Sequence, residues 1–235
     1  MSLDGLTRLN TGVPFLRRIV SRSLLSMTQS GPPHAKSAAP SAAPLAVLHA
    51  EHESMAAVLM TMRVLVRKAR DRVGANDAKV LRAMLYYLDV FPEREHHPKE
   101  ESELFARIRA RTHEADAVLD TLAREHDSGQ GAIRELEQAL LRVEEGGARE
   151  AAAFTTAVER YVGGYIEHMR KEECDVFPLA QRVLTAQDWA QTSVAFASRR
   201  DPLEGVTQRT EYEQLLTRIS NLVPAPLGFG PPGKP

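Results

Sequence analysis

Two stretches of ten residues, HHPKEESELF at 96–105 and HMRKEECDVF at 168–177, share the pattern His-x-x-Lys-Glu-Glu-x-x-x-Phe. In each stretch a histidine precedes a glutamate by four residues; the pairs are His96 with Glu100 and His168 with Glu172. Side chains at positions i and i+4 lie on one face of a helix, one turn apart. The spacing therefore lets the imidazole bind one metal ion while the carboxylate reaches across to a second.

A shorter repeat links AEHES at 50–54 with REHDS at 124–128, so that His52 and His126 occupy equivalent positions. Along the chain the order is a single histidine, a His-x-x-x-Glu pair, a single histidine and the second pair. One such pair is weak evidence for a metal site. Two pairs that alternate with two single histidines are strong evidence, because each of four helices then contributes to one site.

Apolar residues recur three and four residues apart between residues 45 and 183, which is the spacing of a buried helix face. The predicted helices run from Leu45 to before Gly74, from Asp77 through Ile108, from about 113 to 144 and from about 149 to 183. Short connections favour antiparallel neighbours, so the sequence predicts an all-α, up-down-up-down four-helix bundle over residues 45–183. At Pro98 we expect a kink that still lets His96 and Glu100 reach the interior.

The two ends of the chain differ from this region, since most of the 14 prolines precede residue 45 or follow residue 201. Residues 1–44, basic and rich in Pro, Ser and Ala, and residues 223–235 are predicted to be disordered. Additional helices packed on the bundle are expected over residues 184–222, one starting at Thr185 or Asp188 and one over about 208–222. The Arg-rich, acid-poor start also fits a targeting presequence, or an over-extended gene start with initiation at Met27.

The overall composition excludes several classes of partner. The formal net charge is −1, so no bulk positive charge draws the chain to nucleic acid. No apolar run reaches the roughly 20 residues of a membrane span. The single cysteine, Cys174, cannot form a disulfide within the chain and favours a reducing compartment. We therefore expect a cytoplasmic protein that binds neither nucleic acid nor a membrane.

Six polar residues fall on the apolar faces of the four helices: His52, His96, Glu100, His126, His168 and Glu172. A carboxylate inside a bundle is costly unless it is paired or bound to a cation, and no lysine or arginine shares these faces. Four imidazoles and two carboxylates directed at one region therefore predict a metal site.

The neighbours of these residues have less specific predictions. His49 lies at the edge of the first helix's apolar face, where it could ligate or form a hydrogen bond to a ligand. His97 is rotated by about 100° from His96 and is expected to face outward. Glu101 and Glu173 are expected to be surface acids, with a third carboxylate near the metals as the alternative. Tyr161 and Tyr165 are expected to be core aromatics, with gating of the site or a hydrogen bond to a metal-bound ligand as the alternative.

With this set of residues the chain resembles the hemerythrin-like (HHE cation-binding) family, bacterial type, over about residues 45–183. The resemblance implies a non-haem di-iron centre. In that centre His52, His96, His126 and His168 are terminal ligands, and Glu100 and Glu172 bridge the two iron ions.

The resemblance also implies a function, namely binding or reacting with oxygen, nitric oxide or peroxide in sensing, scavenging or stress response. Whether such a protein turns over as an enzyme is left open. Two alternatives stand beside it: a non-catalytic protein for iron storage or delivery, and a structural bundle with another metal or none.

Two departures from relatives matter. Oxygen-carrying hemerythrins place a second histidine one turn away on the third helix, where this chain has Leu122 and Gln130 around His126. Each iron would then have about five ligands against an octahedral preference near six, which leaves both ions an open position. The iron-sulfur-cluster repair proteins of the family carry a Cys-rich N-terminal module, whereas this chain has only Cys174.

Overall fold

The computed structural model describes residues 42–69 and 72–198, and every regular element within them is a helix. The long helices are α3 (Ala42–Ala69), α4 (Ala75–Val90), α7 (Asp116–Glu145) and α8 (Ala148–Lys171). Helix α4 continues through η2 (Pro92–His96), α5 (His97–Lys99), η3 (Glu100–Phe105) and α6 (Ala106–Arg111). Helix α8 continues through η4 (Glu172–Val176) and α9 (Phe177–Val183), and α10 (Ala186–Ser198) follows. The prediction of an all-α fold is confirmed.

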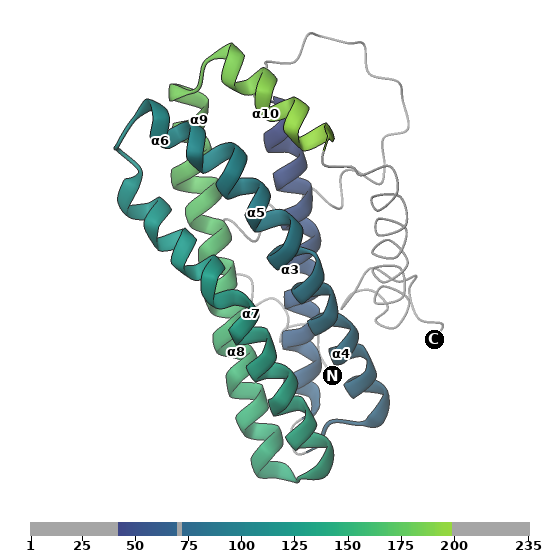
Figure 1. Cartoon of the computed structure of the whole chain (residues 1–235). Coiled ribbons are helices and arrows are strands. Elements are labelled where there is room, and N and C mark those ends of the chain that lie inside the picture. Colours follow the sequence, from purple (N-terminus) through teal and green to yellow (C-terminus); the bar gives the residue numbers. More distant parts are fainter. Residues whose placement is uncertain (1–41, 70–71, 199–235) are drawn as a thin grey trace, which may run out of the picture. The chain divides into compact units, whose positions relative to one another are not determined.

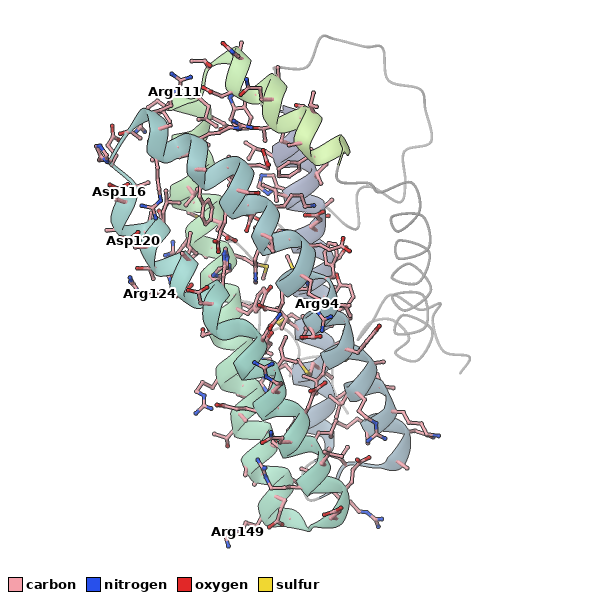
Figure 2. All side chains as sticks on the ribbon, viewed as in Figure 1. Arg94, Arg111, Asp116, Asp120, Arg124 and Arg149 are labelled. Carbon is pink, nitrogen blue, oxygen red and sulfur yellow. The ribbon has the colours of Figure 1, made fainter. Side chains whose placement is uncertain are left out.

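The long helices form a ring in which α3 packs against α4 and α8, and α7 packs against the same two helices (Figure 1). The connections are short; only Gly146 and Gly147 separate α7 from α8. Consecutive helices are therefore antiparallel neighbours, as in an up-down-up-down bundle. Charged side chains such as Arg94, Arg124 and Arg149 lie on the outside of the ring (Figure 2).

Some predicted boundaries were wrong by a few residues. Helix α3 begins at Ala42, with Pro44 in its first turn, where the backbone N–H groups have no helical partner in any case. Gly74, not Asp77, precedes α4. The rest of the predicted disordered ends, and the helix predicted over 208–222, lie outside the described residues.

Two apolar layers lie toward the two ends of the bundle, and a layer of buried polar side chains lies between them. Toward α10, a cluster of buried side chains includes Leu48, Leu104, Leu122, Val176 and Trp189. In the opposite half of the bundle the large, fully buried side chains include Met62, Leu81, Leu85 and Phe154. Polar groups placed between these layers are cut off from water, which raises the cost of leaving them without a partner.

The turns that carry the repeated motif are π-helical. The N–H groups of His97, Ala106 and Phe177 donate to carbonyls five residues earlier. Pro98 and Pro178 each follow such a turn, and a proline would otherwise crowd the carbonyl four residues before it. The second helix therefore continues past Pro98, and both His96 and Glu100 lie in the interior. The wide turns also change which neighbouring residues face inward.

Candidate metal centre

One polar layer crosses the middle of the bundle, and all six residues singled out from the sequence lie in it. Each is between 0 and 7% exposed. They are His52 on α3, His96 on η2, Glu100 on η3, His126 on α7, His168 on α8 and Glu172 on η4. Each of the four helical segments of the ring therefore contributes one imidazole.

The Glu172 carboxylate lies between two groups of histidines. Its Oε2 is 3.3 Å from Nε2 of His52. Its Oε1 is 3.1 Å from Nε2 of His168 and 3.7 Å from Nε2 of His126. The two oxygens thus face imidazoles from opposite sides of the bundle.

Glu100 has the same kind of placement. Its Oε2 is 3.5 Å from Nε2 of His96 and 4.0 Å from Nε2 of His126, and its Oε1 is 3.9 Å from Nε2 of His52. Both carboxylates therefore lie between the His52–His96 side and the His126–His168 side. Glu172 can therefore give one oxygen to each side, whereas in Glu100 the same oxygen, Oε2, lies near imidazoles of both sides.

The donor set fits bound metal better than it fits hydrogen bonding. All four oxygens of Glu100 and Glu172, together with Nε2 of His52, are buried without a hydrogen-bond partner. Two ligands bound at about 2.1 Å to one ion at right angles lie about 3 Å apart, close to the shorter separations in this layer. Among the described residues, no lysine or arginine pairs with either carboxylate. Bound cations would give these buried atoms partners.

The pKa values of the buried side chains in the layer also favour a bound cation. Burial raises the pKa of Glu100 well above its usual value, and the negative charge of Glu172 adds to this. Burial also disfavours ionised Glu172, but the charge of His168 and the contacts with His126 and His168 hold its pKa well below normal. For His168, burial is outweighed by the charge of Glu172 and the bond to Glu125, and its pKa rises to about 9. Without a cation, the layer holds extra protons.

Each of the four histidines is fixed from behind by a second glutamate, which lies at its Nδ1. The pairs are His52 with Glu173 at 3.0 Å, His96 with Glu51 at 2.8 Å, His126 with Glu101 at 2.6 Å and His168 with Glu125 at 2.8 Å. An Nδ1–H that donates to a carboxylate leaves the Nε2 lone pair free for a metal ion. The four glutamates therefore favour a proton on Nδ1 and leave Nε2 as the atom that can ligate.

These supporting contacts follow the internal repeat. Lys99 donates to Glu51 at 2.8 Å, and Lys171 occupies the equivalent place beside Glu125. Likewise the ring of Phe177 stacks on His52, with ring centroids 5.7 Å apart, and Phe105 stacks on His126 at 5.9 Å. Every residue shared by the two ten-residue stretches thus has a matching role in both halves of the layer.

Three expectations about the neighbouring residues need correction or refinement. Glu101 and Glu173 are not simple surface acids, since each binds a histidine of the layer. His49 is 30% exposed, and its Nδ1 lies 3.3 Å from the Glu173 oxygen that also serves His52. It therefore contacts a supporting carboxylate and lies outside the layer. The sequence offered a signal for Glu51 and Glu125, because each precedes the single histidine in the shorter repeat.

The prediction that His97 faces outward was wrong. His97 is only 4% exposed, and its ring stacks on His126 with centroids 3.9 Å apart. The π turn that ends at His96 rotates the next residue inward, which the regular helix spacing could not indicate. Burial, with the charges of His126 and His96, lowers the pKa of His97 well below its usual value, so the imidazole is neutral.

The potential ligand atoms fall into two groups, within each of which all lie within 4.8 Å of one another. One group contains His52, His96, Glu100 and Glu172. The other contains His97, His126 and His168. The division matches two neighbouring cation positions, and both glutamates belong to the first group.

A comparison with protein-family models matches residues 43–180 to the hemerythrin HHE cation-binding domain. The chain belongs to this family. Comparisons with curated proteins and with solved structures gave no match. The family match and the His/Glu layer together support a metal-binding function for this hemerythrin-like bundle. Within the described ranges, none of the helices is both long and apolar enough to cross a bilayer.

Proposed function

We propose that the polar layer holds two iron ions as a non-haem di-iron centre. His52 and His96 bind one ion, His126 and His168 bind the other, and Glu100 and Glu172 bridge them. The observation that carries this proposal is the placement of both carboxylates between two groups of imidazoles, with no hydrogen bond to any of their four oxygens. The negative charges of Glu100 and Glu172 offset the positive charge of the two ions.

We favour iron over zinc because the hemerythrin-like resemblance implies iron, and not because of the ligand count. With two imidazoles and one oxygen from each bridging carboxylate, each ion has four protein ligands, which is also the number that structural zinc sites use. Imidazole with carboxylate suits iron and other ions of higher coordination number. The four glutamates behind the histidines also strengthen imidazole as a donor.

When bound, the iron pair supplies redox chemistry toward oxygen, nitric oxide or peroxide, for sensing, scavenging or stress response in the cytoplasm. The protein's own side chains set the size of molecule that enters. Leu48, Met55, Leu122 and Val176 are buried around the layer, and Tyr165 is almost fully buried. These walls favour reactants of a few atoms over a bulky organic substrate.

Anaerobic reconstitution with ferrous iron tests the proposal. Elemental analysis should approach two irons per chain, and the absorbance spectrum should change when the diferrous protein is mixed with oxygen and, separately, with nitric oxide. Saturation at one iron, or retention of zinc in preference to iron, would contradict the di-iron assignment. Two irons with no response to either gas would favour iron storage or delivery instead.

A further inference from the structure

We infer that His97 is a fifth histidine ligand, bound to the same ion as His126 and His168, and that Glu93 and Gly129 hold it there. The inference rests on the proposed di-iron function and names a ligand that the His-x-x-x-Glu pattern does not contain. A ring nitrogen of His97 lies within 4.8 Å of ligand atoms of both His126 and His168. His97 is therefore close enough to share their ion.

The surroundings of His97 partly resemble those of the other four histidines. Its Nδ1 faces Oε2 of the buried Glu93 at 3.5 Å but makes no hydrogen bond. Its Nε2 lies 3.1 Å from the Tyr165 hydroxyl. A glutamate at Nδ1 also orients the other four imidazoles, at the shorter distances of 2.6 to 3.0 Å.

Glu93 reaches this position only because residue 129 on α7 is a glycine. A Cβ atom on Gly129 would lie 2.2 Å from Oε2 and 2.4 Å from Oε1 of Glu93. The carboxylate thus lies against the α7 backbone, and its Oε1 is buried with no hydrogen-bond partner. A buried acid in this place is costly, which favours a role in fixing a functional histidine.

The fifth histidine makes the two ions unequal. With His97, three imidazoles would hold the ion at His126 and His168, whereas two would hold the ion at His52 and His96. The expectation that both ions keep an open position would then apply to the His52–His96 ion alone.

The inference is tested on the full chain loaded with ferrous 57Fe under anaerobic conditions. Wild-type protein should show two Mössbauer quadrupole doublets of equal area. In His97→Ala one ion should be lost, or should be released to a chelator at least tenfold faster than the other. His113→Ala should release iron like the wild type, since the His113 side chain is 90% exposed.

Two further variants separate ligation from other roles of His97. Gly129→Ala should displace Glu93 and speed release of the same ion, whereas Gly131→Ala, with nothing within 4 Å of its added Cβ, should have no effect. Both changes give α7 the same gain in helix propensity, so the pair controls for folding. Tyr165→Phe removes the hydrogen bond at Nε2 and should leave iron release unchanged.

The inference is overturned if His97→Ala keeps two ions with wild-type release rates, or if Tyr165→Phe reproduces its effect. Circular dichroism of the metal-free variants identifies any that fail to fold, and for those His97→Gln replaces alanine. Failure of the di-iron proposal is recognised separately, from a wild-type stoichiometry below two. In that case a His97→Ala protein that binds its ion as tightly as the wild type also overturns the inference.

Discussion

The Glu51 carboxylate accepts a hydrogen bond from Nδ1 of His96 at 2.8 Å. The next residue in the chain, His52, belongs to the same layer, where its Nε2 faces Glu172. Glu125 stands in the same relation to His168. Each Glu-His pair of the shorter repeat thus contributes one histidine to the polar layer and supports a layer histidine on another helix. Contacts between helices hold the layer together.

Replacing Glu51 by glutamine should weaken iron binding by roughly 10- to 100-fold without changing the stoichiometry at saturation. The amide keeps an acceptor for His96 but loses the charge that strengthens the imidazole and pairs with Lys99. Competition with a calibrated chelator measures the affinity. Glu53→Gln is the matched control, since Glu53 makes no hydrogen bond or ion pair with any described residue. Equal affinities for the two variants would count against a supporting role for Glu51.

Alanine at Glu172 should abolish paired-iron binding. Its two oxygens face His52 on one side and His168 on the other, so its loss removes a ligand from both ions. Elemental analysis after anaerobic loading provides the measurement, with His49→Ala as the control expected to keep two irons. Uptake of two irons by Glu172→Ala, with an unchanged absorbance spectrum, would show that the bridging assignment is wrong.

Iron affinity should rise with pH between about 6 and 8, and loading at pH 7 should release protons. In the metal-free protein the pKa of His168 is raised to about 9 and that of Glu100 is well above normal, so both carry protons that a metal ion must displace. Raising the pH removes these protons and therefore favours binding. Titration calorimetry in two buffers of different ionisation enthalpy counts the protons released. An affinity that is flat or falling over this range would contradict protonated His168 and Glu100 in the metal-free layer.

Removing the metal should lower the stability of the bundle. Ions that bind only the folded state add their binding free energy to folding, about 4 kcal/mol at a free concentration a thousand times the dissociation constant. The metal-free layer also keeps its carboxylates buried without hydrogen bonds. Thermal unfolding with and without a chelator should show the lower midpoint for the metal-free protein. Identical midpoints would mean that little binding energy is coupled to folding.

The sequence was most informative where a residue type recurred at a fixed spacing. Helical periodicity placed the six histidines and glutamates of the layer on inward faces, because 3.6 residues per turn brings i and i+4 together. No role was predicted for the Lys and Phe that the two stretches share, because their partners lie on another helix. Lys99 donates to Glu51, and the Phe177 ring stacks on His52. Only the packing of the helices reveals such partners.

His97 and Glu93 show where periodicity fails. The rotation of about 100° between neighbouring residues holds for an α-helix, but Pro98 follows a π-helical turn that brings both His96 and His97 inward. Glu93 belongs to no repeat, and its place depends on the missing side chain of Gly129 on α7. A glycine that accommodates a side chain from a distant helix looks, in the sequence, like any helix-weakening residue.

The start of α10 should depend on Asp188. Its Oδ2 accepts hydrogen bonds from the backbone N–H of Thr185 at 2.8 Å and from the Thr185 hydroxyl at 2.7 Å, while the Asp188 N–H donates back to that hydroxyl. Arg111 adds two hydrogen bonds of 2.9 Å to the same carboxylate. This reciprocal cap, joined to α6, holds α10 so that Trp189 is buried in the apolar cluster beside the metal layer.

Asp188→Ala should therefore destabilise the protein by about 1–2 kcal/mol at pH 7, from the lost cap and the lost ion pair with Arg111, whose side chain is partly exposed. The Arg111 hydrogen bonds, with those of Thr185, hold the pKa of Asp188 well below its usual 3.8. A lowered pKa in the folded state stabilises above the unfolded pKa, and the stabilisation declines as the pH falls below it. Urea unfolding at pH 7 and pH 3 should show the difference from wild type shrinking at the lower pH.

Gln187→Ala, an exposed change in the same turn, should stay within about 0.5 kcal/mol of wild type at both pH values. A difference for Asp188→Ala that is absent at pH 7, or that grows toward pH 3, would contradict the capping role of Asp188.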